Sequence, residues 1–471
     1  MEIDPHELYS GKRIHIIGIG RSGMAAADVL MCLGAKVTMH DHKDAWQMAD
    51  AFDKARKMGL DARMGDRAYE GIPNADIVIT SPGVPPSCPG IKTAREAGIP
   101  VISEIELAYT ISPAPIIGIT GTNGKSTTSG LVAGILQAQG RTAYLAGNII
   151  AGEIRLPLAR AAFRASPSDV LVGEISSFQL EWIADFHPRV AALLNISTDH
   201  MDRYQGDMAA YIEAKMRIFE NQTADDHAIL NRDDPVVMEL SSRIKSKKWL
   251  FSRAAEVELG TYAKGPQVWV RTPDGDQCVC DTSTMKLRGL HNVENVLAAA
   301  ACVMAFCGDL SNVQEAVDNF EPLAHRLEPV TEINGVEFLN NSMCTNVAAA
   351  VRSLESIGRP VVAIVGGKGK GDEDYAPLAE AFKRTARHVV LIGDEAARMA
   401  DAADKAGYRN VSHALTMEEA VEAAWRHSKP GDTVVLSPSA SSFDMFVSFE
   451  QRGEAFREAV RNLAKRSGAS E

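Results

Sequence analysis

Short apolar runs rich in β-branched residues alternate along this chain with longer stretches whose apolar residues recur at helical spacing. The short runs, each expected to be a strand, are Arg13–Gly18, Lys36–His40, Ile77–Thr80, Ile116–Thr120, Val170–Glu174, Val190–Leu194, Val336–Asn340, Pro360–Val365, Val389–Ile392 and Thr433–Leu436. Helical spacing follows several of them, as over Met24–Leu33 and Met208–Asn221. Because strands that alternate with helices build parallel sheets, the pattern predicts an α/β protein.

Proline-containing segments divide this pattern. Pro113 and Pro115 interrupt it at residues 111–116, and Pro322 interrupts it again. A chain of 471 residues is long enough for about three domains. We therefore predict a Rossmann-like domain over residues 1–110, a central parallel sheet of the phosphate-loop ATPase type over 111–322, and a second Rossmann-like domain over 323–471.

Composition narrows the class of protein. Hydrophobic residues make up 45% of the chain and charged residues 23%, which is typical of globular proteins. The net charge of −12 disfavours a surface that binds nucleic acid. No apolar run reaches the roughly 20 residues that span a bilayer, and the start MEIDPHELYSGK does not resemble a secretory signal. The seven cysteines form no CxxC pair. We expect reduced thiols, a cytoplasmic location, no membrane insertion, no nucleic-acid partner and a monomer.

The stretch after the strand Ile116–Thr120 has the composition of a phosphate-binding loop. It reads GTNGKS over residues 121–126 and runs into a helical pattern. Glycines let backbone N–H groups turn toward a polyphosphate, and the start of the following helix adds positive potential. Lys125 can then reach the outer phosphates, and the Ser126 hydroxyl can bind Mg²⁺. We expect an ATP site, with GTP as the alternative, formed by Gly121, Thr122, Asn123, Gly124, Lys125, Ser126 and Thr127.

Glu174 is a candidate metal ligand. It ends the apolar strand Val170–Glu174, where a buried carboxylate is costly unless it meets a cation. In a phosphate-loop protein that cation is Mg²⁺. A solvated carboxylate at the sheet edge is the alternative interpretation.

The strand Val190–Leu194 leads into a polar loop, NISTDHMDRY. Such a loop lies on the ligand-binding edge of a parallel sheet. His200 sits in it between Asp199 and Asp202, and its role can be catalytic or structural. Lys215, inside the next helical stretch, has the local pattern of a solvated side chain.

The first strand, Arg13–Gly18, runs into GIGRSG and a helix, and the second strand is followed by Asp41. Strand, glycine loop, helix, strand and acid make up the Rossmann nucleotide fingerprint, in which the acid meets a ribose hydroxyl. One such fingerprint leaves three interpretations open: NAD, another nucleotide, or only close packing between helix and strand.

Three loops in the C-terminal part follow strands and are rich in polar residues or glycine. They cover residues 340–346, 366–371 (GGKGKG) and 437–444 (SPSASSFD). Loops at one edge of a parallel sheet bind ligands, and the lysines of the second loop can hold a carboxylate or a phosphate. A basic surface turn is the alternative for GGKGKG.

Several motifs together resemble the Mur ligase family. They are GTNGKS at 121–126, GEISSFQLE at 173–181, NISTDHMDRY at 195–204, HNVEN at 291–295, HRLEPV at 325–330 and SPSASSFDMFVSFEQRGEAF at 437–456. They occur in the family's order, and the resemblance extends from about Gly11 to the end of the chain. It is greatest to the branch that adds D-glutamate to UDP-N-acetylmuramoyl-L-alanine.

The resemblance implies three α/β domains and an ATP-dependent amide ligase of peptidoglycan synthesis. In that reaction ATP phosphorylates the L-alanyl carboxylate, and the glutamate amine attacks the acyl phosphate to give the amide, ADP and phosphate. Phosphorylation supplies the leaving group that a carboxylate lacks. The implied partners are ATP, glutamate, UDP-N-acetylmuramoyl-L-alanine and Mg²⁺ at two sites, because the enzyme must hold several anions together.

The family's motifs also imply roles for single residues. The UDP precursor would contact Arg21, Ser22, Asp41, His42, Ser81, Pro82, Gly83, Asn148, Ser176 and Gln179. Besides its loop, ATP would contact Asn295, Arg326 and Asn341. The glutamate pocket would contain Thr345, Lys370, Ser442, Phe443 and Phe449.

The same resemblance implies a catalytic set made of Lys125, His200 and Lys215. Ser126 and Glu174 would share one Mg²⁺, and His200 would bind a second. Lys215 matches a lysine that the family carbamylates, which turns a cation into an anion that can bind or orient the metal.

This chain departs from the family pattern Asp-Ser-Lys-x-Thr-Asn at residues 341–346, which read NSMCTN. Asn341 replaces an acid near the ATP ribose and can still form hydrogen bonds. Met343 replaces a lysine near the reacting phosphate and cannot supply its charge. We hypothesise that Lys368 or Lys370 supplies that charge instead. Phe443 stands where leucine is usual.

Three alternatives to this function stay open. The first is the same ligation with L-glutamate or another acceptor, although the N-terminal nucleotide domain argues against a folate. The second is a catalytically impaired nucleotide-binding homologue that lost activity with Met343, although Lys125, Glu174, His200 and Lys215 are all present. The third is an NAD-dependent dehydrogenase, which leaves the phosphate loop unexplained.

Overall fold

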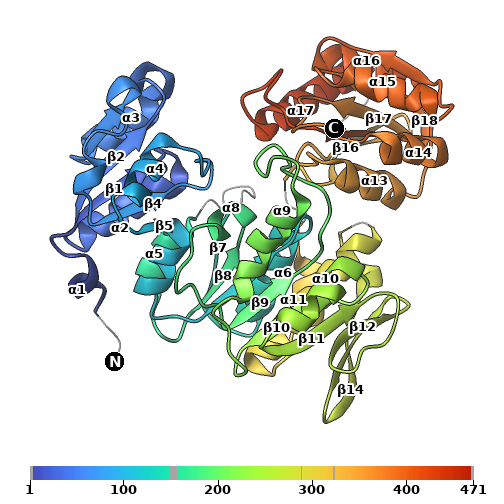
Figure 1. Ribbon diagram of the computed structural model, residues 1–471. Coiled ribbons are helices and arrows are strands. Elements are labelled where there is room, and N and C mark those ends of the chain that lie inside the picture. Colours follow the sequence, from blue (N-terminus) through green and yellow to red (C-terminus); the bar gives the residue numbers. More distant parts are fainter. Residues whose placement is uncertain (1–3, 149–155, 288, 322–323, 468–471) are drawn as a thin grey trace. The chain divides into compact units, whose positions relative to one another are not determined.

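The computed structural model describes residues 4–148, 156–287, 289–321 and 324–467. They form two compact units, and Figure 1 labels many of their helices and strands. The first unit contains the chain up to Ile196 together with Ala209–Ser283 and Asn295–Val317, and the second contains Ser197–Met208, Thr284–Glu294 and the chain from Asp318. The three domain ranges stay a prediction, and their junction at Pro322 lies outside the described residues.

The N-terminal sheet of the first unit has five parallel strands in the order β3-β2-β1-β4-β5. The strands are β1 (Arg13–Ile17), β2 (Lys36–Asp41), β3 (Asp61–Met64), β4 (Ile77–Thr80) and β5 (Val101–Ser103). The helices are α1 (Pro5–Tyr9), α2 (Arg21–Cys32), α3 (Ala49–Lys57), α4 (Pro89–Glu96) and α5 (Glu104–Ile111). This strand order is that of the first five strands of the Rossmann fold, which agrees with the predicted Rossmann-like domain.

The central sheet has nine strands in the order β14-β13-β12-β11-β10-β9-β6-β8-β7. They are β6 (Ile116–Thr120), β7 (Ala143–Gly147), β8 (Val170–Glu174), β9 (Val190–Leu193), β10 (His227–Asn231), β11 (Lys247–Ser252), β12 (Gly260–Lys264), β13 (Gln267–Thr272) and β14 (Gly275–Asp281). The helices of this part are α6 (Lys125–Ala138), α7 (Leu158–Arg164), α8 (Ser177–Leu180), α9 (Met208–Met216), α10 (Pro235–Leu240), α11 (Leu290–Cys307) and α12 (Val313–Asn319). Strand β6 lies between β8 and β9, and all five of its residues are buried. A parallel strand covered on both faces is apolar throughout, which explains the continuous run in the sequence.

The C-terminal sheet belongs to the second unit and has the order β15-β16-β20-β17-β18-β19. Its strands are β15 (Glu328–Ile333), β16 (Val336–Asn340), β17 (Val361–Gly366), β18 (Ala386–Ile392), β19 (Val411–His413) and β20 (Thr433–Ser439). Its helices are α13 (Val347–Ser356), α14 (Ala376–Thr385), α15 (Ala396–Lys405), α16 (Met417–His427) and α17 (Phe449–Arg466). Only β15 runs antiparallel to its neighbour in this sheet.

Both faces of the C-terminal sheet are covered by helices (Figure 1). Alternate residues of β20 point to opposite sides: Val434 packs with Phe456 of α17, and Val435 packs with Phe382 of α14. The alternation of strands and helices is thus confirmed as an α/β fold. The antiparallel strands β13 and β14 extend the central sheet at one end.

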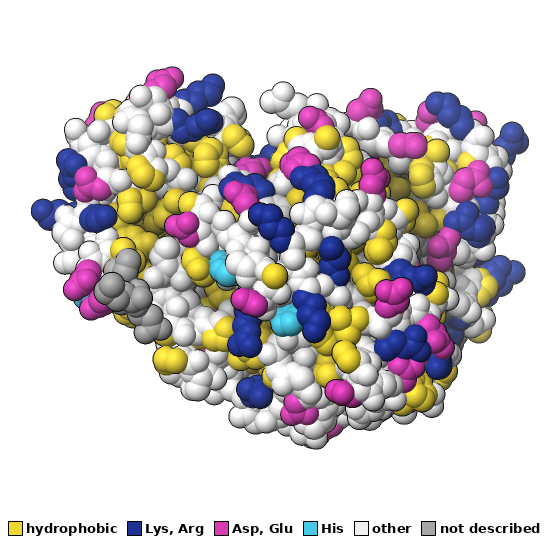
Figure 2. Space-filling model, turned by 60° about the horizontal axis from the view of Figure 1, so that its bottom comes forward, with side chains coloured by type: hydrophobic (Ala, Val, Ile, Leu, Met, Phe, Trp, Pro, Cys, Tyr) yellow, Lys and Arg dark blue, Asp and Glu magenta, His cyan; other side chains and the backbone are white. Residues whose placement is uncertain are grey.

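One described helix, α11, is long and apolar enough to cross a membrane by composition alone, but 72% of the window that qualifies is buried within the protein. Burial of that extent is typical of a core helix. Figure 2 shows that Lys and Arg side chains intermingle with Asp and Glu side chains on the face it displays.

Candidate functional site

The loop between β6 and α6 has a backbone that only glycine tolerates at two positions. Gly121 has a φ of 151° and Gly124 a φ of 86°. A Cβ on Gly121 would lie 3.0 Å from the Cβ of Leu194, and one on Gly124 would lie 2.5 Å from Oδ1 of Asn295. The glycines therefore allow the close approach of backbone that a phosphate-binding loop requires.

Asn195, the second residue after β9, holds this loop in place. The N–H of Thr122 donates to its carbonyl oxygen at 2.9 Å, and the N–H of Asn123 donates to its Oδ1 at 2.8 Å. Its Nδ2 donates back to the carbonyl of Asn123 at 3.1 Å. The sequence analysis gave Asn195 no role. Its signal is its position, since it follows a strand that pairs directly with the strand before the loop.

Two lysines converge on one carbonyl oxygen of the loop. The Nζ of Lys125 donates to the carbonyl oxygens of Gly121 and Thr122, each at 2.9 Å. The Nζ of Lys215 donates to the same Gly121 oxygen at 2.8 Å. Two ammonium groups so close together repel each other unless an anion compensates them, and a polyphosphate is such an anion.

Lys215 is buried, so its prediction as a solvated side chain is wrong. Only 2% of it is exposed. Its Nζ lies 4.7 Å from the ring centre of Tyr211, whose hydroxyl is 3.1 Å from Oγ1 of Thr122. Helical periodicity could not show this burial, because it reports only an apolar stripe along a helix. The C-terminal end of α9, which carries Lys215, instead contacts the phosphate-binding loop. The helix also ends at Met216 instead of continuing to Asn221.

The chemistry of Glu174 and Ser126 fits a magnesium ion. Glu174 ends β8 beside Ile119 of β6, and it is 4% exposed. Among the described residues its Oε2 is buried without a hydrogen-bond partner. A buried carboxylate oxygen without a donor is costly, and a cation offsets that cost. The described residues contain no cluster of three His, Cys, Asp or Glu side chains that could hold a metal alone. A Mg²⁺ ion at Glu174 would therefore complete its coordination with the Ser126 hydroxyl and phosphate oxygens.

Seven of the residues predicted for the UDP site lie at or after the ends of β1, β2 and β4, which lie in register at one edge of the N-terminal sheet: Arg21, Ser22, Asp41, His42, Ser81, Pro82 and Gly83. The carboxylate of Asp41 accepts the N–H groups of Ile19 and Lys43, each at 3.1 Å. The Ser81 hydroxyl donates to the Gly18 carbonyl at 2.9 Å. Both residues thus shape the glycine loop. Arg21, His42 and Gly83 are exposed, and Ser22 and Pro82 are half-buried.

Two further residues of that set, Ser176 and Gln179, bond to each other. The backbone N–H and the hydroxyl of Ser176 both donate to Oε1 of Gln179 at 2.9 Å, which forms a capping box at the start of α8. The N–H of Asn148 donates to the carbonyl of Glu174 at 2.9 Å, so Asn148 itself lies beside the end of β8.

The residues predicted around the adenosine part of ATP are divided between the units. Asn295 belongs to the first unit, where its Oδ1 accepts the Thr128 hydroxyl at 3.2 Å. Arg326 and Asn341 belong to the second. The Nδ2 of Asn341 lies 2.9 Å from the Ser353 hydroxyl and 3.3 Å from that of Ser437. The amide donates both bonds, whereas an aspartate at this position could only accept bonds from the two hydroxyls.

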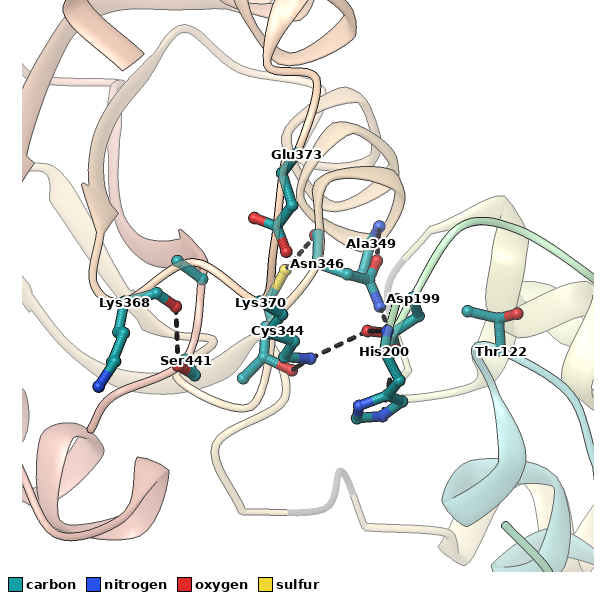
Figure 3. A network of polar contacts seen from close by, with 12 residues as sticks. Thr122, Asp199, His200, Cys344, Asn346, Ala349, Lys368, Lys370, Glu373 and Ser441 are labelled. Carbon is teal, nitrogen blue, oxygen red and sulfur yellow. Dashed lines mark hydrogen bonds and ion pairs between the residues drawn. The ribbon is translucent and has the colours of Figure 1, made fainter. Parts of the chain in front are cut away.

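In the second unit, the loop after β9 and the glycine loop after β17 meet in a polar network (Figure 3). The Nζ of Lys370 lies 3.0 Å from Oδ1 of Asp199 and 3.1 Å from Oγ1 of Thr345. The Nδ2 of Asn346 donates to Oδ2 of Asp199 at 3.2 Å. Lys370 and Thr345, both predicted to hold glutamate, are therefore brought together, and the charge of Lys370 is balanced by Asp199.

His200 is oriented by its neighbour in the same network. Its φ is 54°, a left-handed conformation that a side chain rarely adopts, and its N–H donates to Oδ1 of Asp199 at 3.0 Å. Its Nε2 lies 3.7 Å from Oδ2 of the same carboxylate. His200 belongs to the second unit and Lys125, Glu174 and Lys215 to the first, so its role toward a metal rests on the resemblance alone.

The remaining predicted glutamate residues lie on the loop after β20 and at the start of α17. Ser442 is buried, whereas 68% of Phe443 is exposed. The ring of Phe449 meets that of His325 edge to face at 6.0 Å. Lys368 pairs through its backbone with Ser441, and its side chain is exposed. The hypothesis that Lys368 or Lys370 supplies the positive charge missing at Met343 remains a prediction.

Comparisons with known proteins agree with this architecture. Family models match in chain order: the Mur ligase MurD-like N-terminal domain over residues 12–103, the Mur ligase middle domain over 119–303 and the Mur ligase glutamate ligase domain over 325–440. A protein of Trichlorobacter lovleyi, named UDP-N-acetylmuramoylalanine–D-glutamate ligase, is 41% identical over 96% of this chain and 99% of its own. A protein of Koribacter versatilis with the same name is 41% identical over 97% of this chain and 98% of its own. The chain belongs to the Mur ligase family.

Solved structures share the fold of this Mur ligase. UDP-N-acetylmuramate-alanine ligase MurC from Thermotoga maritima is 18% identical, with a TM-score of 0.62 over 96% of this chain and 100% of its own. A pseudomurein peptide ligase type C from Methanothermus fervidus is 19% identical, with a TM-score of 0.59 over the same shares of the two chains. At this identity the likeness concerns the fold alone.

The hydrogen bonds that Asn195 makes to the phosphate-binding loop lead to a prediction for nucleotide binding. Asn195→Ala removes both side-chain hydrogen bonds to Asn123, each worth about 1 kcal/mol, and leaves the loop less ordered before ATP arrives. We expect the Kd for a non-hydrolysable ATP analogue with Mg²⁺, measured by calorimetry, to rise about tenfold.

Asn221→Ala is the matched control, because its Nδ2 also donates two hydrogen bonds, to the carbonyls of Ala184 and Phe186, away from the loop. Both variants should lower the unfolding temperature, and only Asn195→Ala should weaken nucleotide binding. Equal Kd values for the two variants would contradict the role given to Asn195.

Proposed function

We propose that this chain is an ATP-dependent ligase that joins D-glutamate to UDP-N-acetylmuramoyl-L-alanine in peptidoglycan synthesis. The proposal is carried by one observation: proteins with that activity in their names are similar to this chain over nearly the full length of both, at 41% identity. The sites described above support it, because each has groups suited to one of the anionic substrates.

In this proposal the phosphate loop binds ATP. Lys125 supplies a positive charge at the loop, and the start of α6 supplies N–H donors. Ser126 and Glu174 would hold Mg²⁺, which when bound neutralises charge between the phosphates. The residues of the N-terminal sheet edge would bind the UDP part of the precursor.

The reaction then needs two transfers. A carboxylate oxygen of the alanyl group attacks the γ-phosphorus, and the bond to the bridging oxygen breaks, so ADP leaves with that electron pair. The glutamate nitrogen attacks the acyl carbon, and phosphate leaves with the electrons of the carbon–oxygen bond while the nitrogen gives up a proton. Thr345, Lys370, Ser442 and Phe449 would orient the acceptor, and Phe443 would border the pocket.

We also propose a second Mg²⁺ site at His200 and a carbamylated Lys215. Carbamylation joins the neutral amine nitrogen to CO₂ and releases one proton, which gives an anion. The position of Lys215 favours it, because a buried ammonium that shares a carbonyl with Lys125 gains by becoming negative. The proposal further includes a monomer in the cytoplasm without membrane insertion, in which the three predicted ranges act as domains.

Carbamylation can be measured directly. After equilibration with ¹³C-bicarbonate, we expect a carbamate carbon signal in the NMR spectrum of the wild type and its loss in Lys215→Arg, which keeps a long basic side chain. A wild-type spectrum without this signal would refute the modification.

Phosphate release tests the function itself. ATP, Mg²⁺ and UDP-N-acetylmuramoyl-L-alanine are incubated with D-glutamate, with L-glutamate, or with neither. We expect sustained release only with D-glutamate, its loss on chelation of the metal, and recovery when Mg²⁺ is returned. Release with L-glutamate alone would refute the acceptor assignment, and no release with either would indicate a catalytically impaired homologue.

A further inference from the structure

Arg452 is a fully buried arginine whose charge is held by neutral groups. It lies in the first turn of α17 and is 1% exposed. Its Nε donates to the Ser342 hydroxyl at 3.1 Å and one terminal nitrogen donates to the Ser342 carbonyl at 2.9 Å. The other terminal nitrogen donates to the carbonyls of Ala440 and Ser441, each at 3.1 Å. None of these acceptors is a carboxylate.

The guanidinium thereby joins two of the three loops that the sequence predicted as ligand-binding, and the remaining loop packs beside it. Ser342 lies in the first loop, and its hydroxyl also donates to the carbonyl of Phe449 at 2.8 Å. Ala440 and Ser441 lie in the third. The second loop approaches through Gly367, where a Cβ would lie 3.0 Å from a terminal nitrogen of Arg452 and 2.2 Å from the Ser441 carbonyl.

The residues predicted to hold glutamate are direct neighbours of these anchored atoms. Ser442 follows Ser441, Thr345 lies in the loop of Ser342, and Phe449 begins the helix that carries Arg452. Replacing the guanidinium would therefore disturb the acceptor pocket through three separate segments of the chain.

Among the described residues of these loops, Arg452 is a buried cation whose hydrogen-bond acceptors are all neutral, and the carboxylate of Asp444 in the third loop offsets only part of the effect of burial on its pKa. Lys370 is paired with Asp199 at 3.0 Å, the side chain of Lys368 is exposed to solvent, and Met343 carries no charge. Burial lowers the pKa of the Arg452 guanidinium to about 10, so it stays charged at neutral pH. In a medium of low dielectric constant a charge acts over a longer distance than at the surface.

We propose that Arg452 is a positioning residue of the acceptor pocket, which joins two of its three loops and gives it the positive potential that selects an acceptor with two carboxylates. This inference rests on the proposed function, in which that acceptor is glutamate. The sequence analysis included Arg452 in the final motif without giving it a role.

The test compares D-glutamate with D-glutamine, which has nearly the same shape but one carboxylate fewer. We expect Arg452→Met to lower the ratio of kcat/KM for glutamate to kcat/KM for glutamine about tenfold, with little change in KM for ATP. Arg452→Lys keeps the charge and loses the planar fork of donors. It should lower kcat/KM for both acceptors and keep their ratio. Arg461→Met, an exposed position on the same helix, is the matched control and should behave as wild type.

If Arg452 had a purely structural role, Arg452→Met would lower kcat/KM for glutamate and for glutamine by the same factor. An unchanged ratio of the two kcat/KM values in a folded, active variant therefore overturns the inference and leaves the proposed function intact. If Arg452→Met does not fold, Arg452→Lys decides, because wild-type kcat/KM values in that variant would show that the fork is not needed. A wild type that releases no phosphate with glutamate would overturn the proposed function and this inference with it.

Discussion

The carbonyl oxygen of Gly121 accepts hydrogen bonds from two lysine ammonium groups, and the candidate site of the first unit depends on this arrangement. It requires a backbone that turns its carbonyl toward Lys125 and Lys215, which the φ of 151° at Gly121 allows. It also requires a stable loop, which the neighbouring strand β9 provides through Asn195. The fold thus brings two lysine side chains to one carbonyl oxygen, an arrangement that suits a polyphosphate beside Lys125 and favours carbamylation of Lys215.

In the second unit the two cations near the predicted acceptor pocket have different kinds of partner. Lys370 is paired with Asp199, while Arg452 is buried among carbonyl and hydroxyl oxygens. A buried cation whose hydrogen-bond acceptors are all neutral costs stability, and such costs are usually found where a ligand makes use of them. The strained backbone of His200 and the left-handed Ser439, with φ values of 54° and 60°, occur on loops of this same unit. At His200 and Ser439 the strain falls on stretches predicted to bind ligands, whereas the left-handed Asn334 lies in the turn between β15 and β16.

Much of the fold could be predicted from the sequence, because β6, β8, β17 and β20 are buried on both faces and therefore read as unbroken apolar runs. The phosphate loop could be predicted because its chemistry depends on adjacent residues. The rest depends on residues far apart in the sequence. Lys215 is buried because α9 packs against a loop 94 residues earlier, and Arg452 bonds to Ser342, which is 110 residues away. Periodicity within one element carries no information about such contacts.

The most direct test of this account is a crystal structure with a non-hydrolysable ATP analogue and Mg²⁺. We predict the terminal phosphates against the N–H groups of residues 121–126, with Mg²⁺ bound by the Ser126 hydroxyl and Oε2 of Glu174, and Lys125 turned from the Gly121 carbonyl to a phosphate. Nucleotide bound elsewhere, or a Glu174 carboxylate that does not contact the metal, would contradict it.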